Sequence, residues 1–548
     1  MKLLKSSLLG SAAAFAAVGA AHAADLPVKK AVPIEYVRVC GAYGAGFFYI
    51  PGTDTCLRLS GRARFEGGYM TSYSRQGTNG DTSGYQGRMR INLDARTQTA
   101  YGTLRAFVRL DAGSRTGYSG VGTSGTQQRI AQAFPGLGID QFGRAQQFVN
   151  VDKAFIQFAG MTAGRASSFF DFYAHDFEFA GATLGSDVAS TNLLAYTATL
   201  GNGLSATISV EDPVFRRSPI FSQTNNPTGA TVNATIQNFA QTAAPAEVFI
   251  GYTGGVPTRF SFVDAIQRSR LPDFVGALRL DQAWGSAQVS AAVHELNVGN
   301  VQSGAGTGTG SNISIPHTSN SYGWAVQGGL KINTPFIAPG DALYLQGAYG
   351  SGAQMYTGYC AFSGCYSQNP ATIQGQKFAQ YMNDATINPF SGRLEQSTSF
   401  TATASYLHYW TPEWRSAFFG SYGEMSYSSG ARLAQGAAFA LANPTGNSFG
   451  VNAVGVPGTR FFQLSEALRD TYQFVAGGSI IWSPVKDLDI GVEGFYTQIG
   501  VKNGRVIDRD KTPTAYANVA GINNGTFVPR TTTADSVSTF RFRVQRDF

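Results

Sequence analysis

The sequence lacks a long hydrophobic run. No stretch reaches ~18 uninterrupted apolar residues, the length that a helix needs to cross a bilayer. The longest candidate, Leu8 to Ala20, lies between the basic Lys2 and Lys5 and a small-residue site ending at Ala23, as in a secretory signal. We therefore expect residues 1–23 to be a signal peptide and the mature chain to be exported. If the mature chain spans a membrane, it must do so with strands.

Charge and histidine are also scarce. Charged residues make up 14% of the chain, against about 25% in an average globular protein. Removing Lys2 and Lys5 lowers the formal net charge from +7 to +5, which is modest for 548 residues and predicts no nucleic-acid surface. There are five histidines, and the sequence contains no nucleophile elbow, paired metal ligands or phosphate loop, so we expect no enzyme, cofactor or metal. A phospholipase using His175, His294 or His408 beside a serine is conceivable, but we interpret each as an ordinary wall or loop residue.

Cysteine is limited to four residues in two close pairs, Cys40 with Cys56 and Cys360 with Cys365. An exported chain meets an oxidising compartment, so two local disulfides are expected. The alternative, a zinc site, has no nearby histidine to complete either pair.

What the sequence has is a strict alternation of apolar and polar side chains. Segments 57–71, 85–98 and 101–111 each put apolar or small residues on one face of a strand and charged residues on the other. The last strand does the same, with Phe540, Phe542, Val544 and Phe548 opposite the polar residues between them. An arginine that faces lipid at mid-depth costs ~2–4 kcal/mol, so a bilayer enforces such a phase energetically. The strands of soluble β-sandwiches also alternate apolar and polar side chains. The connections between the strands distinguish a soluble sandwich from a membrane barrel.

Sixteen segments have strand character, and the connections between them are alternately long and short. This rhythm predicts an all-β, antiparallel up-and-down transmembrane barrel with short periplasmic turns and long outer loops. The later segments are 147–160, 161–169, 190–200, 203–212, 274–283, 286–297, 321–333, 341–351, 398–409, 414–427, 470–483, 487–500 and 534–548. Eighteen strands is the alternative, because Ala246 to Tyr252 and Arg259 to Val263 could form a further hairpin, in the membrane or on the loop 213–273.

The third long loop, about 170–189, is acidic and aromatic. A barrel of about sixteen strands is too wide for its side chains to fill, so we expect this loop to fold inward and narrow it. Opposed rows of fixed charge would then orient dipolar solutes and screen ions by sign. The predicted constriction residues are Arg62, Arg64, Arg88, Arg90, Arg105, Arg109 and Arg165 on the wall, and Asp171, Asp176, Glu178 and Asp187 on the loop. Two alternatives stay open: the arginines pair with Glu66, Asp94 and Asp111 to stiffen the wall, or the loop acids lie solvated outside.

Four stretches resemble the general-diffusion porins of alphaproteobacterial outer membranes. They are Tyr36 to Arg58, with its two cysteines, Ala154 to Gly160, Val275 to Ala287, and the closing Val544 to Phe548. The resemblance implies a sixteen-stranded trimeric channel for small hydrophilic solutes, embedded in outer-membrane lipid and lipopolysaccharide. It also implies that the barrel-assembly machinery reads Phe548. Two features depart from the family: the long loops 213–273 and 428–469, and Arg546 at an apolar position of the last strand.

The expected organisation is a signal peptide (1–23), a periplasmic lead-in (24–56) and the barrel (57–548). The expected function is passive diffusion of small hydrophilic solutes and ions across the outer membrane of a Gram-negative bacterium. A substrate-specific uptake channel and a non-conducting surface barrel or adhesin are the alternatives. The solute, the sign of ion preference and the pore width do not follow from the sequence.

Overall fold

The computed structural model describes residues 38–71, 82–117, 146–173, 175–179, 181–186, 190–218, 220–221, 245–254, 256–264, 267, 269–298, 301–302, 320–359, 377–378, 380–442 and 453–548. The predicted signal peptide, Asp187, Cys360 and Cys365 lie outside the described residues. The chain divides into two compact units, Met1–Leu57 and Arg58–Phe548.

The first unit is small and held by a disulfide. The 3-10 helix η1 (Gly41–Tyr43) and β1 (Phe48–Tyr49) lie between Cys40 and Cys56, whose sulfur atoms are bonded at 2.01 Å. Tyr49 is opposite Cys56 in the antiparallel register, and both cysteines are buried with Phe47. The disulfide predicted between Cys40 and Cys56 is therefore present.

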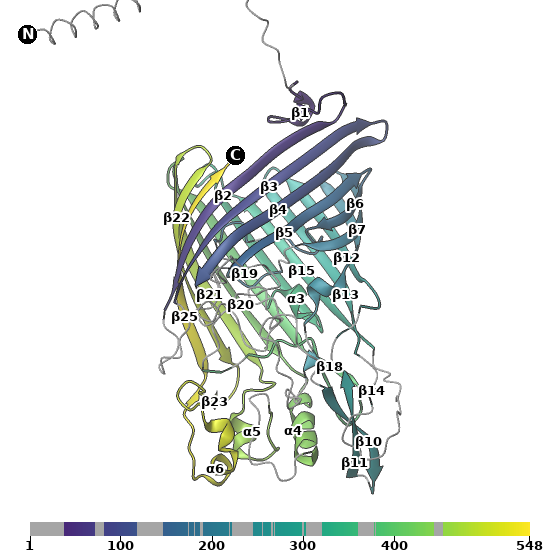
Figure 1. The fold of residues 1–548 in the computed structure, drawn as a ribbon, viewed down its shortest axis with the longest axis vertical. Coiled ribbons are helices and arrows are strands. Elements are labelled where there is room, and N and C mark those ends of the chain that lie inside the picture. The colour runs from purple at the N-terminus through teal and green to yellow at the C-terminus, as the bar shows by residue number, and fades with distance from the viewer. Residues whose placement is uncertain are drawn as a thin grey trace, which may run out of the picture. The chain divides into compact units, whose positions relative to one another are not determined.

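The second unit is built on a closed ring of sixteen antiparallel strands, in which each strand pairs with the next along the chain and the last pairs with the first (Figure 1). Its strands are β2 (Cys56–Met70), β3 (Ser83–Thr99), β4 (Gly102–Gly117), β5 (Gln146–Phe158), β6 (Met161–Ala166), β7 (Thr191–Gly201), β8 (Leu204–Glu211), β12 (Asp273–Gln282), β13 (Gly285–Leu296), β15 (Ser321–Asn333), β16 (Ala342–Ser351), β19 (Thr398–Tyr409), β20 (Trp414–Ser426), β21 (Thr471–Val485), β22 (Leu488–Val501) and β25 (Ala534–Asp547). The predicted fold and its sixteen strands are confirmed.

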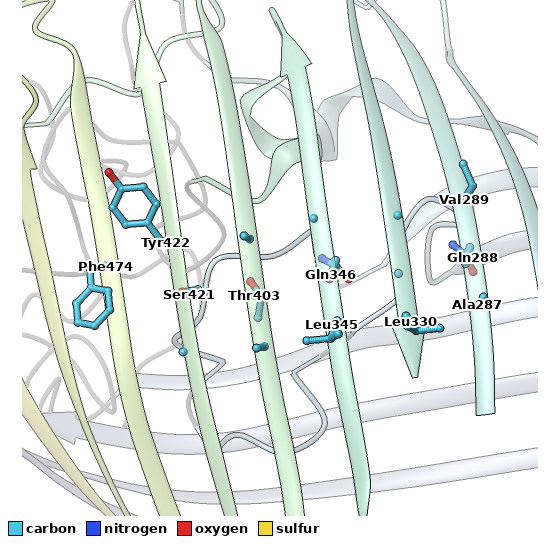
Figure 2. A pocket seen from close by; sticks show the side chains of 16 residues that line it. Ala287, Gln288, Val289, Leu330, Leu345, Gln346, Thr403, Ser421, Tyr422 and Phe474 are labelled. Atoms are coloured by element: carbon cyan, nitrogen blue, oxygen red, sulfur yellow. The ribbon is translucent and has the colours of Figure 1, made fainter. Parts of the chain in front are cut away.

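The alternation seen in the sequence separates two environments around this ring. Met89, Leu93 and Leu104 are exposed on the outward face, whereas Asp94 and Asp111 are buried on the inward face. On β15, β16, β19 and β20, small outward residues leave a groove flanked by Leu330, Leu345 and Tyr422 (Figure 2). A bilayer supplies the apolar surroundings that such an outer surface needs.

The ring closes at the end of the chain. The amide of Phe548 donates to the Gly61 carbonyl at 3.0 Å, and the Gly61 amide donates to the Phe548 carbonyl at 2.8 Å. Arg546, on the apolar phase, is exposed and donates from Nη1 to the Lys486 carbonyl at 2.6 Å. Its charge is therefore held at the rim by a backbone oxygen of the β21–β22 turn, so the alternation is kept at low cost.

The hairpin that left the strand count open lies outside the ring. β10 (Pro245–Thr253) and β11 (Val256–Asp264) pair with each other and then with β14 (Val301–Gln302), in a separate three-stranded sheet. The eighteen-strand alternative is therefore wrong. Figure 1 shows this hairpin beyond the same end of the barrel strands as α4 (Ala431–Ala442), α5 (Arg460–Leu464) and α6 (Val519–Asn524).

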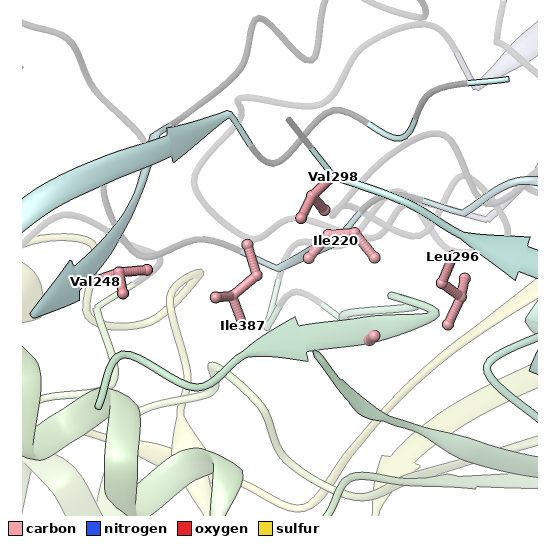
Figure 3. Packing of buried hydrophobic residues seen from close by; sticks show 6 residues of the cluster. Ile220, Val248, Leu296, Val298 and Ile387 are labelled. Carbon is pink, nitrogen blue, oxygen red and sulfur yellow. The ribbon is translucent and has the colours of Figure 1, made fainter. Parts of the chain in front are cut away.

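The long connections have their own hydrophobic cores. Ile220, Leu296 and Ile387 are buried together with Val248 and Val298 (Figure 3). Ile220 belongs to β9 (Ile220–Phe221), which joins β17 (Ala385–Ile387) and β18 (Leu394–Gln396) in a second small sheet. The remaining short elements are η3 (Pro213–Arg216), α3 (Gln354–Thr357), β23 (Val506–Ile507), η5 (Ala515–Ala517) and β24 (Thr531–Thr532). None of the helices in the described ranges is long and apolar enough to cross a membrane.

Candidate functional site

Arginines gather on the inward face where β25 and β2 to β4 meet. Strand periodicity brings them together, because residues two apart along a strand share a face and neighbouring strands lie about 4.8 Å apart. We call eight of these arginines, each of which forms an ion pair, the arginine wall. They are Arg62 and Arg64 on β2, Arg88, Arg90 and Arg96 on β3, Arg105 and Arg109 on β4, and Arg543 on β25.

Single carboxylates in the wall each bridge two guanidinium groups. Asp111 accepts from Arg88 and Arg90, both at 2.9 Å. Arg96 and Arg105 lie directly opposite each other in the register, and Asp94 binds both, at 2.8 and 2.9 Å. Like charges across a strand pair repel, so the shared carboxylate offsets that repulsion.

The same sharing occurs at the seam where the barrel closes and on β5. Glu66 on β2 pairs with Arg543 at 2.5 Å and with Arg64 at 3.5 Å. Asp152 lies 3.4 Å from Arg109 and 3.9 Å from Arg90. Arg62 has a partner of its own, Asp547, at 2.7 Å.

Because the carboxylates are shared, the wall is positive. Its ion pairs join eight arginines to five carboxylates, an excess of three positive charges. The side chain of Arg88 is 31% exposed, while that of its partner Asp111 is 2% exposed. Arg105 and Asp94 differ in the same sense, at 26% and 11%. The guanidinium groups therefore face the lumen and most of the carboxylates lie behind them.

The described residues of the connection 167–190, which we call the inner loop, cross the interior of the ring. The Phe170 carbonyl accepts from Ser290 on β13 at 2.7 Å and from Gln327 on β15 at 2.8 Å. The amides of Tyr173 and Leu184 donate to Gln346 on β16 and to Ser421 on β20, both at 2.9 Å. These four barrel residues, Ser290, Gln327, Gln346 and Ser421, are buried on the inward face of their strands. The neighbouring positions on β16 and β20 carry Leu345 and Tyr422, which face outward (Figure 2).

The middle of the inner loop reaches the edge of the arginine wall at Phe179. The Phe179 amide donates to Glu493 on β22 at 2.6 Å, and its carbonyl accepts from Nη2 of Arg543 at 2.6 Å. The Arg543 guanidinium also lies 4.2 Å from the centre of the Phe179 ring. The loop therefore follows the arc of strands from β13 to β25, and the wall on β2 to β4 continues the circle.

Two predicted loop acids, Asp171 and Glu178, do not face the wall arginines, and that part of the hypothesis is corrected. Asp171 binds Arg216 at 2.7 Å and Ser186 at 2.5 Å. Glu178 accepts from the amides of Ala182 and Thr183, at 2.7 and 3.0 Å, and contacts His175 at 3.2 Å. The loop turns back on itself, and these carboxylates satisfy its buried donors.

The remaining predicted residues have different surroundings. The Asp176 side chain is exposed on the inner loop, but partial desolvation by the surrounding protein raises the pKa of its carboxyl group, although Lys331 and His175 act to lower it. Burial alone would raise the pKa of Glu178, but the His175 imidazole and the Thr183 donors bring it below the usual value. Arg165 donates to the Val151 carbonyl at 2.7 Å and lies over the Phe215 ring. The sequence left open that the wall arginines pair with Glu66, Asp94 and Asp111, and the structure has ion pairs to all three of these carboxylates.

Arg96, Arg543 and Arg216 are charged residues beside the lumen that were not among the predicted constriction residues. Arg96 and Arg543 have the same strand phase as the predicted arginines, so the alternation alone was enough to find them. Arg216 lies in η3, where no periodic pattern identifies it, yet it is completely buried.

A closed sixteen-stranded ring, apolar outside and polar inside with a loop folded into its lumen, defines an outer-membrane diffusion channel. The chain belongs to the porin family: the family model described as "Porin subfamily" matches residues 25–524. Porin Omp2b of Brucella neotomae is 31% identical over 74% of this chain and 88% of its own length. Porin Omp2b of Brucella suis biovar 1 is 32% identical over 66% of this chain and 78% of its own length.

Among solved structures, the outer membrane channel DcaP of Acinetobacter baumannii aligns with a TM-score of 0.48 and 13% identity, over 91% of this chain and 99% of that one. Family membership confirms the predicted function and location. The protein is a passive pore for small hydrophilic solutes and ions in the outer membrane of a Gram-negative bacterium.

Proposed function

We propose that the arginine wall and the inner loop together form the constriction of this pore, and that the constriction favours anions. The observation that carries the proposal is the charge of the wall: its ion pairs contain eight arginines and five carboxylates, which leaves three positive charges in excess. Rings of one charge select ions of the opposite sign, and a narrow lumen with low-dielectric walls strengthens their field. Asp171 contributes little opposing charge because it pairs with Arg216, and the Glu178 carboxylate is turned inward to the Ala182 and Thr183 amides of the loop.

The test is the reversal potential of single channels in a potassium chloride gradient. We expect the wild-type pore to prefer chloride, more strongly at 0.1 M than at 1 M salt, because the Debye length falls from about 10 to 3 Å. The double variant Arg88→Gln, Arg105→Gln should lose about half of the preference or more, since it removes two of three excess charges. Asp111 and Asp94 keep Arg90 and Arg96 as partners, so no carboxylate is left unpaired.

Arg505→Gln is the matched control, because Arg505 is exposed, lies outside the barrel strands and bonds to Thr531. It should leave the reversal potential unchanged. A cation preference in the wild type, or an equal shift in the control, would contradict the proposal.

The assembly state completes the proposal. We expect a homotrimer in outer-membrane lipid and lipopolysaccharide, inserted by the barrel-assembly machinery with Phe548 as its signal. Ala63 is exposed and Gly67 is half-buried on β2, and these small residues support close approach of a neighbouring wall, whereas Gly61 is buried against the Phe548 ring. Chemical cross-linking in native membranes should yield a covalent trimer, and the assembly that has not been cross-linked should survive mild detergent and dissociate to monomer on boiling. Cross-linking that yields monomers alone would contradict it.

A further inference from the structure

A buried arginine connects the inner loop to other loops of the pore. Arg216 ends η3, in the connection that follows β8, and its side chain is 0% exposed. Its Nη2 donates to Asp171 at 2.7 Å and its Nη1 to the Ser186 hydroxyl at 2.6 Å. Asp171 and Ser186 also bind each other, at 2.5 Å, although they are fifteen residues apart. Arg216 thus joins the two ends of the inner loop.

The same arginine contacts the connection after β16. Its guanidinium lies 4.6 Å from the centre of the Tyr356 ring on α3, and Nη1 is 3.5 Å from the Met355 carbonyl. Tyr356 is itself fixed to the wall, because its hydroxyl donates to Asp273 at the start of β12 at 2.7 Å. Nearby, Gly358 packs so closely on Gly185 of the inner loop that a Cβ atom would overlap the Gly185 carbonyl. Three connections therefore meet around one guanidinium group.

The acidic and aromatic groups around position 216 suit an arginine better than a lysine. Glu211, at the end of β8, accepts from the Phe169 amide of the inner loop at 3.2 Å, and its charge and that of Asp171 both act on Arg216. A planar guanidinium binds two acceptors in fixed directions and stacks on an aromatic ring, which an ammonium group does not do as well. A buried pair of this kind is costly to break from one side, because the remaining charge is left unpaired.

We propose that Arg216 is the positioning residue that holds the inner loop across the lumen, so that the connection after β8 sets the width of the pore. Hydrogen bonds to inward-facing barrel residues attach the loop at Tyr173 and Leu184, whereas Arg216 joins Asp171 and Ser186 to each other and to α3. The role in pore width rests on the proposed constriction, and the position of the loop can be measured separately from the current.

The first measurement is amide hydrogen exchange of residues 168–186 in the detergent-solubilised full chain. Arg216→Gln should speed exchange about tenfold or more, because it removes two hydrogen bonds of a charged donor from a fully buried site. Arg505→Gln, with the same loss of charge on an exposed side chain, should leave exchange unchanged. Equal exchange in Arg216→Gln and wild type would overturn the proposal.

The second measurement is single-channel recording on the same proteins. Arg216→Gln should change the mean conductance and at least double the open-channel noise, since a loop that has lost the link between Asp171 and Ser186 through Arg216 samples more positions. Arg216→Lys should give intermediate values, because it keeps the charge and loses the paired donors. Faster exchange with unchanged conductance would keep the anchoring role but overturn the inner loop as the constriction.

The double variant Arg216→Gln, Asp171→Asn tests the proposal in case the single variant Arg216→Gln does not fold. It removes both charges of the hydrogen-bonded pair, so the Asp171 carboxylate is not left buried without its partner. Heat-modifiable migration in detergent electrophoresis shows whether the barrel has formed. A folded double variant with wild-type exchange and wild-type noise would overturn the proposal.

Discussion

Replacing Glu66 by glutamine should lower the free energy of unfolding of the barrel by about 3 kcal/mol. Glu66 is 5% exposed and pairs with Arg64 on its own strand and with Arg543 on β25, across the seam where the ring closes. Removing one member of a buried charge network costs about 3–5 kcal/mol, because the remaining charges lose their compensation without regaining water. The neutral amide leaves the Arg64 and Arg543 guanidinium groups without the carboxylate that bridges them.

The measurement is urea-induced unfolding of the protein in lipid vesicles, followed by tryptophan fluorescence and by heat-modifiable migration. Asp281→Asn is the control, because Asp281 also pairs with an arginine, Arg279, but the two side chains are 56% and 41% exposed. Exposed pairs contribute about 0–1 kcal/mol, so this variant should unfold close to the wild type. If the two variants have equal midpoints, the seam network does not stabilise the barrel.

The second large effect concerns pH and Asp384, in the connection between β16 and β19. Asp384 is completely buried and accepts from the amides of Ser218 and Gln354, at 2.8 and 2.9 Å. Burial raises the pKa of its carboxyl group from 3.8 to about 6, although nearby His294 and the amide donors act to lower it. Arg217 is a further charged group that interacts with it.

The sign of the pH effect follows from where the proton binds. Between pH 6 and pH 4 the folded protein holds a proton on Asp384 that the unfolded chain has released, so stability rises as the pH falls through this window. A shift of about two pKa units corresponds to on the order of 3 kcal/mol. At pH 7.5 the carboxylate is charged and buried, and the free energy of unfolding of these connections is lower by that amount than at pH 4.

Hydrogen exchange resolves this effect. Protection factors of the amides of Ser218 and Gln354, corrected for intrinsic exchange, should rise on going from pH 7.5 to pH 5. In Asp384→Asn, which cannot titrate, that rise should disappear. A variant that keeps the wild-type pH dependence would assign the effect to another group.

The strands could be predicted from sequence because their signal is local. Met89, Leu93 and Asp94 occupy the phase that a bilayer on one side and water on the other require, and each position can be judged from its neighbours along the chain. The β10–β11 hairpin carries a similar local signal, and for that reason its place was ambiguous. Whether a hairpin enters the ring depends on its pairing partner, β14, which is nearly forty residues away from β11.

The candidate site was predictable only in part, for the same reason. Alternation identified Arg88, Arg90 and Arg105 as inward-facing, but it did not show that Asp111 and Asp94 would each serve two of them. Asp171 and Glu178 carry the same charge as any exposed loop acid, and only the folded loop brings them to Arg216 and to Thr183.

By itself, then, the sequence determined that the strands alternate between lipid and water and that they form an up-and-down barrel. These two properties follow from short-range periodicity, because each residue carries its own solvation cost. The count of sixteen depended on the β10–β11 hairpin pairing outside the ring. The tertiary structure decided the ion pairs, the excess of positive charge facing the lumen and the burial of Arg216. Those depend on distances between segments remote in the chain, because a charge is compensated by whichever group the fold places within about 4 Å.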